Sequence, residues 1–429
     1  MARWPSPKRL LVAVGIIWLC GMAFIFKHVV DLITRTAVLE AEEEARWRNS
    51  TDAPVDLAGL KSLRTGVQAR NAAASLKIAN LISTSNFSHI IVAQIHSRIP
   101  YINALLDSMS TVRGIETALI VFSHDLVDLE IESAVATRNA TLNIVQIYFP
   151  FSIQLHGNEF PAPGHRDCPE RLEKRKAAKW GCRGSNSSDL YGNYRNAKLS
   201  QVKLHWWWKF HYTFTNISLA RTGIPVLFVE EDHYLLPDAL FLLDYFWKLR
   251  LTACDPPCPT VAIAHHRVKL ADYDDAYRHY HIGPWSGSTN IGLIFSYDNY
   301  LTVANCSQVF CDVDDYNWDW SVYFIMNRCV ETEFEMLMVK APRILHIGNC
   351  AGLHHGKTDE ECDMARNIAE AKKKVKKLTK NGDLFPVDME QRRATWMQQQ
   401  KEQVENGGWG DWRDRQLCRS ITKSFIGRV

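Results

Sequence analysis

The feature that most constrains the fold is a series of short apolar segments that each end in polar residues. Six of them follow one another along the chain: HIIVAQIH (89–96), IETALIVFSHD (115–125), TLNIVQIYFP (141–150), IPVLFVEED (224–232), TVAIAHH (260–266) and NIGLIFS (290–296). Between the first two, IPYINALLDSMSTV has apolar residues at helical spacing. Strands that alternate with helices predict a mostly parallel sheet flanked by helices, with ligands bound beyond the carboxyl ends of its strands. We therefore expect one α/β body with a polar site at that edge.

Other nucleotide-binding classes and nucleic-acid binding are disfavoured by the sequence. It contains neither GxGxxG nor GxxxxGK[ST], so a dinucleotide Rossmann enzyme or a P-loop enzyme is not expected. The net charge of +3 over 429 residues is too small to indicate nucleic acid as a partner. The basic run AKKKVKKLTKNG (371–382) is interpreted as a solvated helix face.

The N-terminus predicts a membrane anchor. Lys8 and Arg9 precede an apolar segment without charges, Leu10 to Phe26, and no small-residue cleavage pattern follows it. The basic flank favours a cytosolic N-terminus with the body across the membrane. We expect a cytoplasmic tail over 1–9, a transmembrane signal anchor over 10–26, a polar luminal stem over 27–85 and a catalytic domain over 86–429.

Cysteine usage indicates an oxidising compartment. Cys20 lies inside the apolar segment, and the ten cysteines beyond it would form up to five disulfides. A zinc site is the alternative, but Cys254 and Cys258 form the only close pair and no second close pair completes a tetrad. Six Asn-x-Ser/Thr sequons agree with a luminal body; they begin at Asn49, Asn86, Asn139, Asn186, Asn216 and Asn305.

Three consecutive acids, Glu230, Glu231 and Asp232, directly follow the fourth apolar segment. Their mutual repulsion is costly unless a cation offsets it. Oxygen ligands suit Mg²⁺ or Mn²⁺, which bind through one or two carboxylates together with phosphate oxygens. A cation clamped to a diphosphate is the arrangement of nucleotide-sugar glycosyltransferases, where it stabilises the departing charge. A strand that simply ends in a solvated loop is the alternative.

A second acidic cluster, CDVDDYNWDWSVYF, offers a general base. An inverting glycosyl transfer needs one group that takes the proton from the attacking hydroxyl. A carboxylate among these aromatic residues would have apolar walls that raise its pKa. The chemistry does not choose among the four candidates, which are Asp312, Asp314, Asp315 and Asp319. An acidic surface helix without a catalytic role is the alternative.

A third stretch, APRILHIGNCAGLHH, offers a nitrogen ligand for the same metal. His346 follows a short apolar strand and could bind the cation through a ring nitrogen. His354 and His355 are equally compatible with the spacing, and a structural histidine is the alternative.

Several stretches together resemble one family. FVEEDHYLLPD, QVKLHWWWKFHY, YFPFSIQLHGNEFP, CDVDDYNWDWS, PRILHIGNC and NGGWGDWRDRQLC are similar to the alpha-1,6-mannosyl-glycoprotein 2-beta-N-acetylglucosaminyltransferases, the N-acetylglucosaminyltransferase II family, from about residue 88 to about residue 420. The resemblance implies a GT-A fold, a Rossmann-like mixed and mostly parallel sheet flanked by helices, in a single-pass type II Golgi membrane protein. It also implies Mn²⁺ as the cofactor and is compatible with a homodimer.

The activity implied by the resemblance is that of an inverting hexosyltransferase. Such an enzyme moves N-acetylglucosamine from UDP-GlcNAc to the 2-hydroxyl of the α1,6-arm mannose of N-glycans, which starts the second antenna of complex N-glycans. A luminal sibling enzyme that acts on the α1,3-arm is the closest alternative. A glycan-binding protein without catalytic activity, or a glycosidase, belongs to a different class. Release of UDP that depends on metal and on a mannose-terminated acceptor would separate these functions.

The resemblance also implies roles for single residues. Asp319 is the catalytic base, Asp232 and His346 hold the metal, and Asn290 and Trp318 face the acceptor. Leu204 stands where the family pattern has a histidine. The donor-binding positions are Gln94, Ile95, His96, Ser97, Arg98, Asp125, Gln201, Val202, Lys203, Leu204, His205 and Arg267. The acids before Asp232 are expected to order the water shell of the metal or the neighbouring loops.

The disulfide pairing implied by the resemblance accounts for all ten luminal cysteines. The pairs are Cys168–Cys182, Cys254–Cys258, Cys306–Cys329, Cys311–Cys418 and Cys350–Cys362. The second pair encloses three residues where the family has two. The third and fourth would fasten the DDYNWDW segment from both directions, which suits a base that must keep a fixed pose.

Overall fold

The computed structural model describes most of the chain. The described residues are 7–49, 56–138, 141–266, 273, 277–285, 290–330, 335–348, 350, 363–392 and 404–426, with side chains from Trp18 onward. They divide into two compact units, one of residues 1–55 with 179–181 and one of residues 56–178 with 182–429.

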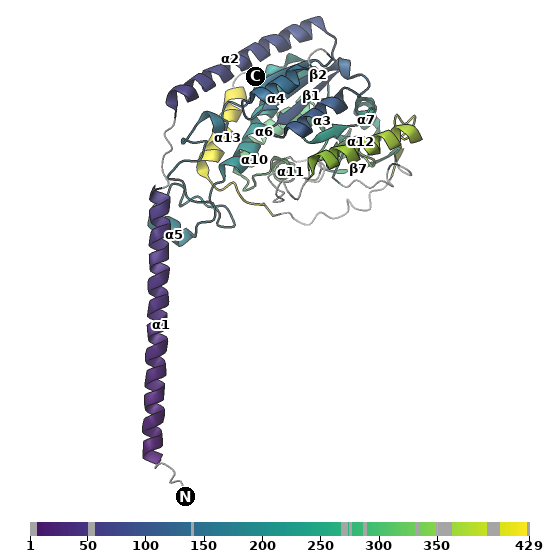
Figure 1. Ribbon diagram of the computed structural model, residues 1–429. Helices are drawn as coiled ribbons and strands as arrows, with labels where there is room; N and C mark the ends of the chain where they lie inside the picture. The colour runs from purple at the N-terminus through teal and green to yellow at the C-terminus, as the bar shows by residue number, and fades with distance from the viewer. Residues whose placement is uncertain are drawn as a thin grey trace. The chain divides into compact units, whose positions relative to one another are not determined.

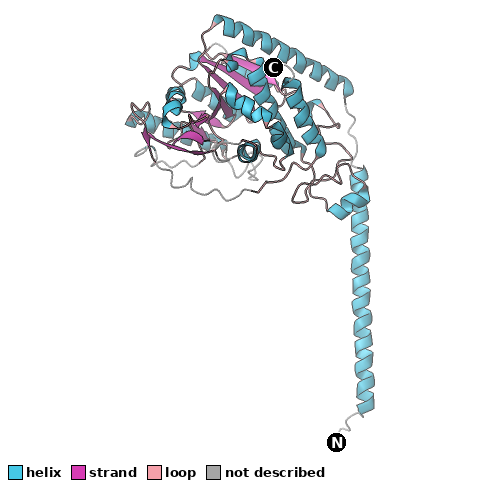
Figure 2. Ribbon diagram, turned by 180° about the vertical axis from the view of Figure 1, so that it is seen from behind, coloured by secondary structure: helices cyan, strands magenta, loops and turns pink. Residues whose placement is uncertain are grey.

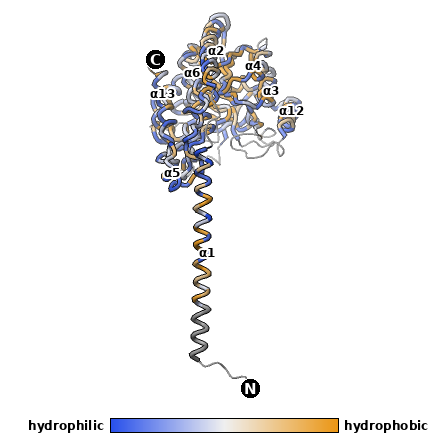
Figure 3. Tube along the Cα trace, turned by 60° about the vertical axis from the view of Figure 1, so that its left-hand side comes forward, coloured by the Kyte–Doolittle hydropathy of each residue, from blue (hydrophilic) through white to orange (hydrophobic). Residues whose placement is uncertain are grey.

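The first unit is built around α1 (Pro7–Asn49). Figure 3 shows the described part of α1 as hydrophobic over its middle and hydrophilic toward its C-terminal end. Among the described residues, no helix has both the length and the apolarity needed to cross a membrane. The side chains of Leu10 to Ile17, the first part of the predicted anchor, lie outside the described ones.

A mixed sheet forms the centre of the second unit, and Figure 2 shows it in magenta among the helices. Among the described residues it has nine strands, in the order β11-β7-β9-β6-β8-β4-β1-β2-β3. The strands are β1 (His89–Ile95), β2 (Ala118–His124), β3 (Ile144–Tyr148), β4 (Val226–Glu230), β6 (Thr260–Ala262), β7 (His279–Pro284), β8 (Leu293–Phe295), β9 (Glu335–Val339) and β11 (Glu390–Gln391). The half β4-β1-β2-β3 is parallel, whereas β8 is antiparallel to β4 and β6. Each of the six predicted segments contains a strand.

A smaller sheet lies beside the end of β4. It pairs β5 (His233–Leu235) with β10 (Ile344–His346) in antiparallel register. His346 stands opposite His233 in this ladder. The two strands therefore bring the acidic stretch Glu230–Asp232 and the stretch that carries His346 together.

Helices cover both faces of the large sheet (Figure 1). Along β1, Ile90 and Val92 belong to one hydrophobic cluster, and Ile91 and Ala93 to another. Because successive strand residues point to opposite faces, both faces of β1 are buried, and its sequence is therefore continuously apolar. Beyond α1, the described helices of the chain are α2 (Leu57–Thr84), α3 (Ile99–Met109), α4 (Leu129–Ala136), α5 (Lys174–Trp180), α6 (Ala197–Asn216), α7 (Ala239–Ala253), α9 (Tyr297–Asn305), α10 (Ser307–Asp312), α11 (Trp318–Arg328), α12 (Met364–Asn381) and α13 (Trp412–Ile426).

Helix α6 runs through the core of the unit. Its residues are buried on nearly every side, as expected for a helix that is apolar and aromatic all round. Trp206 stacks on Trp318 of α11 with ring centroids 4.4 Å apart, and Trp207 stacks on Phe310 of α10 at 4.0 Å. The helix begins at the cap Asn196, whose side chain accepts hydrogen bonds from the first turn.

Helix α2 covers the outer edge of the sheet. The amide of Asn71 donates to the carbonyl of Tyr148 at 2.7 Å and accepts from its N–H at 2.8 Å, so it pairs with β3 as a neighbouring strand would. Lys77 donates to the carbonyl of Ile144 at the other end of β3. The compact unit therefore starts at Asp56. This boundary differs from the predicted division between stem and catalytic domain at residue 85.

Four disulfides match predicted pairs: Cys168–Cys182, Cys254–Cys258, Cys306–Cys329 and Cys311–Cys418. Cys350 is disulfide-bonded as well, and its predicted partner Cys362 lies outside the described residues.

Candidate functional site

A cavity of about 1560 Å³ opens at the carboxyl ends of the central parallel strands. β1 and β4 pair with Gln94 opposite Glu230, so both deliver their last residues to the same edge. The polar strand ends thus meet in one place, as the segment pattern predicts. The predicted site residues that line the cavity are Gln94, His96, Arg98, Asp125, Gln201, Val202, Asp232, Asn290, Trp318, Asp319 and His346.

The first two of the three consecutive acids hold neighbouring parts of the wall. Glu231 accepts from the backbone N–H of His96 and from Nε of Arg98, both at 2.6 Å. Glu230 accepts from the indole N–H of Trp318 at 3.2 Å. These contacts fix the loop after β1 and the start of α11, in line with the expected ordering role.

Asp232 is held differently. Its Oδ2 accepts from Nη2 of Arg98 at 2.7 Å and lies 3.5 Å from Nε2 of His346. Burial would raise the pKa of Asp232, but the hydrogen bond and charge of His346, with the charge of Arg98, hold it well below its usual range. Its Oδ1 is buried and has no hydrogen-bond partner among the described residues. A carboxylate that stays ionised and leaves one oxygen unused is suited to a cation.

The groups around that oxygen fit a divalent cation. Glu230, Asp232 and His233 each offer one ligand atom, and these atoms lie within 4.8 Å of one another. His346 approaches the same carboxylate from β10. Oxygen and imidazole ligands in this number suit a divalent cation that keeps positions open for phosphate oxygens. His354 and His355 lie outside the described residues.

Gly348 makes the position of Asp232 possible. A Cβ on Gly348 would overlap the Asp232 carboxylate, so any larger residue there must push the carboxylate away. Sequence reasoning missed this residue. A glycine two positions after the candidate ligand His346 is the signal that could have found it, because glycine permits close approach of the backbone.

The four aspartates of the second acidic cluster have separate roles. Asp312 pairs with Arg419 at the surface. Asp314 accepts from the N–H groups of residues 190 and 409, and Asp315 accepts from the backbone and side chain of residue 406. Of the four, Asp319 lines the cavity. Of the four candidates, packing therefore brings Asp319 alone among the described residues to the cavity wall.

Asp319 stands in the first turn of α11. Its Oδ1 accepts from the N–H of Trp320 and its Oδ2 from the amide of Asn290, both at 2.9 Å. Burial raises the pKa of Asp319 to about 7, and the charges of Glu230 and Asp315 act in the same direction, although the Trp320 hydrogen bond opposes them. A carboxylate whose pKa is near neutrality can both accept and return a proton.

A hydrogen-bonded cluster of three side chains also lines the cavity. Nδ1 of His96 lies 2.8 and 2.9 Å from the two carboxylate oxygens of Asp125. Gln201 donates to the same carboxylate at 3.0 Å. These three side chains come from β1, from the end of β2 and from α6, and together they offer polar groups to a bound nucleotide.

Other predicted donor positions lie elsewhere. Ile95 and Leu204 are buried in the two hydrophobic clusters, and His205 is buried against Ser123 at 2.7 Å. Ser97 is exposed outside the cavity, and Arg267 lies outside the described residues.

Lys203, another predicted donor position, is buried beneath the cavity wall. Its Nζ donates to the carbonyl of Asp315 at 2.7 Å and lies 4.2 Å from the ring centre of Trp409. Burial lowers the pKa of Lys203 to about 7. In this position it supports the segment that precedes Asp319.

The basic run lies on α12. Lys373, Lys374 and Lys377 line the cavity, together with Lys198 at the start of α6. The interpretation as a solvated face alone is therefore incomplete, because these cations stand at the rim of the site.

Comparisons with known proteins agree on one family. The family model described as N-acetylglucosaminyltransferase II (MGAT2) matches residues 64–418. The alpha-1,6-mannosyl-glycoprotein 2-beta-N-acetylglucosaminyltransferase of Mus musculus is 37% identical over 337 residues, which cover 78% of this chain and 74% of that protein. The protein of the same description from Homo sapiens is 36% identical over 339 residues, 78% of this chain and 73% of its own. The protein of the same description from Arabidopsis thaliana is 28% identical over 340 residues, which cover 78% of this chain and 75% of that protein.

Proposed function

The chain belongs to the N-acetylglucosaminyltransferase II family, and we propose that it transfers N-acetylglucosamine from UDP-GlcNAc to the 2-hydroxyl of the α1,6-arm mannose of N-glycans. The observation that carries the proposal is the contrast between two carboxylates in one cavity. Asp232 has a pKa held far below the usual range, whereas the pKa of Asp319 is raised to about 7. Environments that separate two acids in this way suit one permanent anion and one proton acceptor.

In the proposed reaction, Asp319 is the general base. It takes the proton of the attacking mannose hydroxyl while that oxygen bonds to the anomeric carbon of the donor from the face opposite the leaving UDP. A single displacement of this kind inverts the anomeric configuration. The Asn290 amide and the Trp320 N–H hold the two oxygens of the base in place.

Asp232 and His346 would hold a divalent cation, for which we propose Mn²⁺. The unused Oδ1 of Asp232 supports this assignment. When bound, the cation supplies stabilisation of the negative charge on the departing diphosphate. His96, Asp125 and Gln201 would contact the nucleoside, and the lysines at the rim would attract the anionic donor.

We further propose a GT-A assignment for the fold and a luminal position in the Golgi behind a type II anchor. The parallel half-sheet, in which β4 with its acidic end borders the antiparallel β8, supports the fold assignment. The disulfides support an oxidising compartment. Protection of the C-terminal body from protease in sealed Golgi vesicles would test the topology, and digestion of the body without detergent would contradict it.

The deciding experiment is release of UDP from UDP-GlcNAc by the purified protein. We expect it to require both Mn²⁺ and an acceptor with a free mannose on the α1,6-arm. An acceptor with only the α1,3-arm mannose free serves as the matched control. Equal use of both acceptors, glycan cleavage without UDP-GlcNAc, or glycan binding without UDP release would each contradict the proposal.

The metal assignment is tested separately by Asp232→Ala. This variant removes the carboxylate that leaves one oxygen unused, so UDP–Mn²⁺ binding measured by calorimetry should weaken. Undiminished metal-dependent binding of UDP by the variant would exclude Asp232 as a ligand.

A further inference from the structure

Two side chains outside the metal pair and the base form a continuous hydrogen-bonded chain to Asp319. Nδ2 of Asn290 donates to Oδ2 of Asp319 at 2.9 Å. Oδ1 of Asn290 lies 2.7 Å from Nε2 of His266. Asn290 precedes β8 and His266 follows β6, so two neighbouring strands of the large sheet carry the chain to the N-terminal turn of α11.

The chemistry of the three groups fixes the orientation of the Asn290 amide. An ionised carboxylate only accepts, so the amide must turn its nitrogen toward Asp319. Its oxygen then faces His266, where Nε2 must carry the proton. If the amide turned over, its oxygen would face the carboxylate, and two acceptors would repel each other. With Nε2 protonated, His266 donates to the amide oxygen and so supports the orientation of Asn290 that donates to Asp319.

The other oxygen of the base is held as well. Oδ1 of Asp319 accepts from the N–H of Trp320, which is fixed by the helix. The charged groups that bear on the carboxylate, Glu230 from β4 and Asp315 from the preceding loop, are both anionic. Asn290 is thus the side chain that offers Asp319 a hydrogen-bond donor from a separate element.

We propose that Asn290, oriented by His266, is a positioning residue that fixes the Asp319 carboxylate toward the acceptor hydroxyl. The inference rests on the proposed role of Asp319 as general base, and it assigns Asn290 a task beyond the contact with the acceptor that the family resemblance implies. When both oxygens of the Asp319 carboxylate accept a hydrogen bond, the carboxylate cannot rotate. The lone pair that takes the proton then keeps one direction, which proton transfer from the acceptor hydroxyl requires.

The first test is Asn290→Ala. Loss of the donor destabilises the ionised form of Asp319, so the ascending limb of kcat against pH should move to higher pH by about one unit. At pH 7 kcat should fall about fivefold, and about tenfold at pH values well below 7, while KM for UDP-GlcNAc stays unchanged. Asn143→Ala is the matched control, because the amide of Asn143 donates only to the Glu116 carbonyl at the opposite end of β3.

The second test uses His266. His266→Gln keeps an N–H donor and should retain most of kcat, whereas His266→Leu should reproduce the effect of Asn290→Ala. In the double variant Asn290→Ala/His266→Leu, the two losses of kcat should not add, because both substitutions act on the same hydrogen bond to Asp319. The affinity for UDP–Mn²⁺, measured by calorimetry, should be unchanged in all three variants.

A readout independent of activity separates this inference from the proposed function. Carbon-13 titration of aspartate carboxyls in the free protein, assigned with Asp319→Asn, measures the pKa of Asp319 directly. A higher pKa in Asn290→Ala supports the inference even if the wild type fails to transfer N-acetylglucosamine, which would overturn only the proposed function. An unchanged pKa and pH limb, with a raised KM for the glycan acceptor alone, would overturn the inference.

Discussion

At the scale of the residue, the site depends on which hydrogen bonds each carboxylate accepts. Both oxygens of Glu231 accept from the loop after β1, Oε1 of Glu230 accepts from Trp318, and each oxygen of Asp319 accepts from a donor. Asp232 keeps one buried oxygen without a partner among the described residues. Four acids of the same charge therefore have different tasks because their neighbours differ.

The first prediction concerns the pH dependence of the reaction. Because the pKa of Asp319 is raised to about 7, the carboxylate is protonated below that pH and cannot accept the hydroxyl proton. We expect kcat to rise about tenfold per pH unit up to about pH 7 and then to level off. Asp319→Asn should abolish transfer but bind UDP–Mn²⁺ nearly as well as the wild type. A flat pH profile, or a loss of UDP affinity in step with activity, would contradict the base assignment.

The second prediction concerns Gly348. Gly348→Ala would place a methyl group against the Asp232 carboxylate, so the carboxylate must move from His346. We expect UDP–Mn²⁺ affinity to fall about tenfold or more, the usual effect of disturbing a metal ligand through its neighbours. Gly66→Ala on α2 is the control, because its methyl group meets only the flexible end of Arg70. Equal UDP–Mn²⁺ affinities in Gly348→Ala and Gly66→Ala would show that the Asp232 carboxylate can move without loss of metal binding, which would contradict this prediction.

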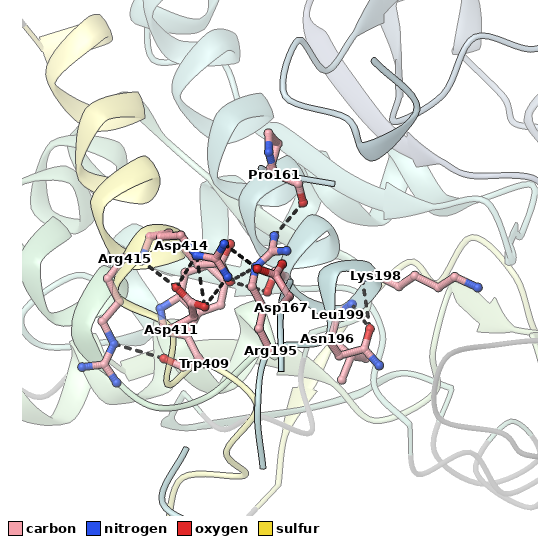
Figure 4. A network of polar contacts seen from close by, with 12 residues as sticks. Pro161, Asp167, Arg195, Asn196, Lys198, Leu199, Trp409, Asp411, Asp414 and Arg415 are labelled. Atoms are coloured by element: carbon pink, nitrogen blue, oxygen red, sulfur yellow. Dashed lines mark hydrogen bonds and ion pairs between the residues drawn. The ribbon is translucent and has the colours of Figure 1, made fainter. Parts of the chain in front are cut away.

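At the scale of the element, α6 and α13 are fastened to each other at the end of α6 that carries Gln201. Figure 4 shows Asp414 of α13 pointing toward Arg195, just before α6. Asp414 accepts from Nε of Arg195 and from the hydroxyl of Ser200, both at 2.7 Å, and Arg195 also donates to the carbonyl of Pro161. This buried network fixes the helix that carries one wall of the cavity.

The third prediction tests that fastening. Asp414→Asn leaves the buried Arg195 without its counter-charge, so the free energy of unfolding should fall by about 3 kcal/mol. Chemical denaturation measures this change. Glu390→Gln is the matched control, since the exposed pair of Glu390 with Arg278 should contribute less than about 1 kcal/mol. A loss as small as that of the control would mean that the buried network adds little to stability.

At the scale of the whole molecule, the compact unit begins earlier than the sequence suggests. Val67, Ala74 and Ile78 of α2 are buried, and Asn71 pairs with the backbone of β3. The polar, acidic character of the segment before residue 85 led to its interpretation as a stem. The partner that α2 requires, the edge of the sheet, is a tertiary feature that its own sequence does not reveal.

The fourth prediction follows from this boundary. A chain that begins at Asp56 should remain folded and as active as the full chain. A chain that begins at residue 86 would expose the edge of β3 and the apolar surface under α2, so it should aggregate or unfold at a lower temperature. Thermal denaturation and size-exclusion chromatography of the two chains make the comparison. Equal stability of both would show that α2 is dispensable.

The sequence predicts the strands and the edge at which they deliver polar residues, because both follow from local patterns. Each of the six apolar segments contains a strand, while β7, β9 and β11 lacked an equally clear pattern. The choice of Asp319 could not be made locally. It depends on Asp314 and Asp315, which are bound by residues 91 to 124 positions away in the sequence. His266 and Gly348 were missed because they act through a neighbour.

The dependence of Asp319 on distant residues has a consequence for biosynthesis. The segment that leads to the base is held by Asn406 and Trp409, and Cys418 bonds the adjacent Cys311. These partners follow every described strand and the candidate metal ligands along the sequence, so they are translated later. A nascent chain therefore contains its described strands and its candidate metal ligands before it contains the residues that hold the segment before Asp319. A chain cut before Asn406 would therefore keep the strands and the candidate metal ligands but would lack the contacts that hold the segment before Asp319.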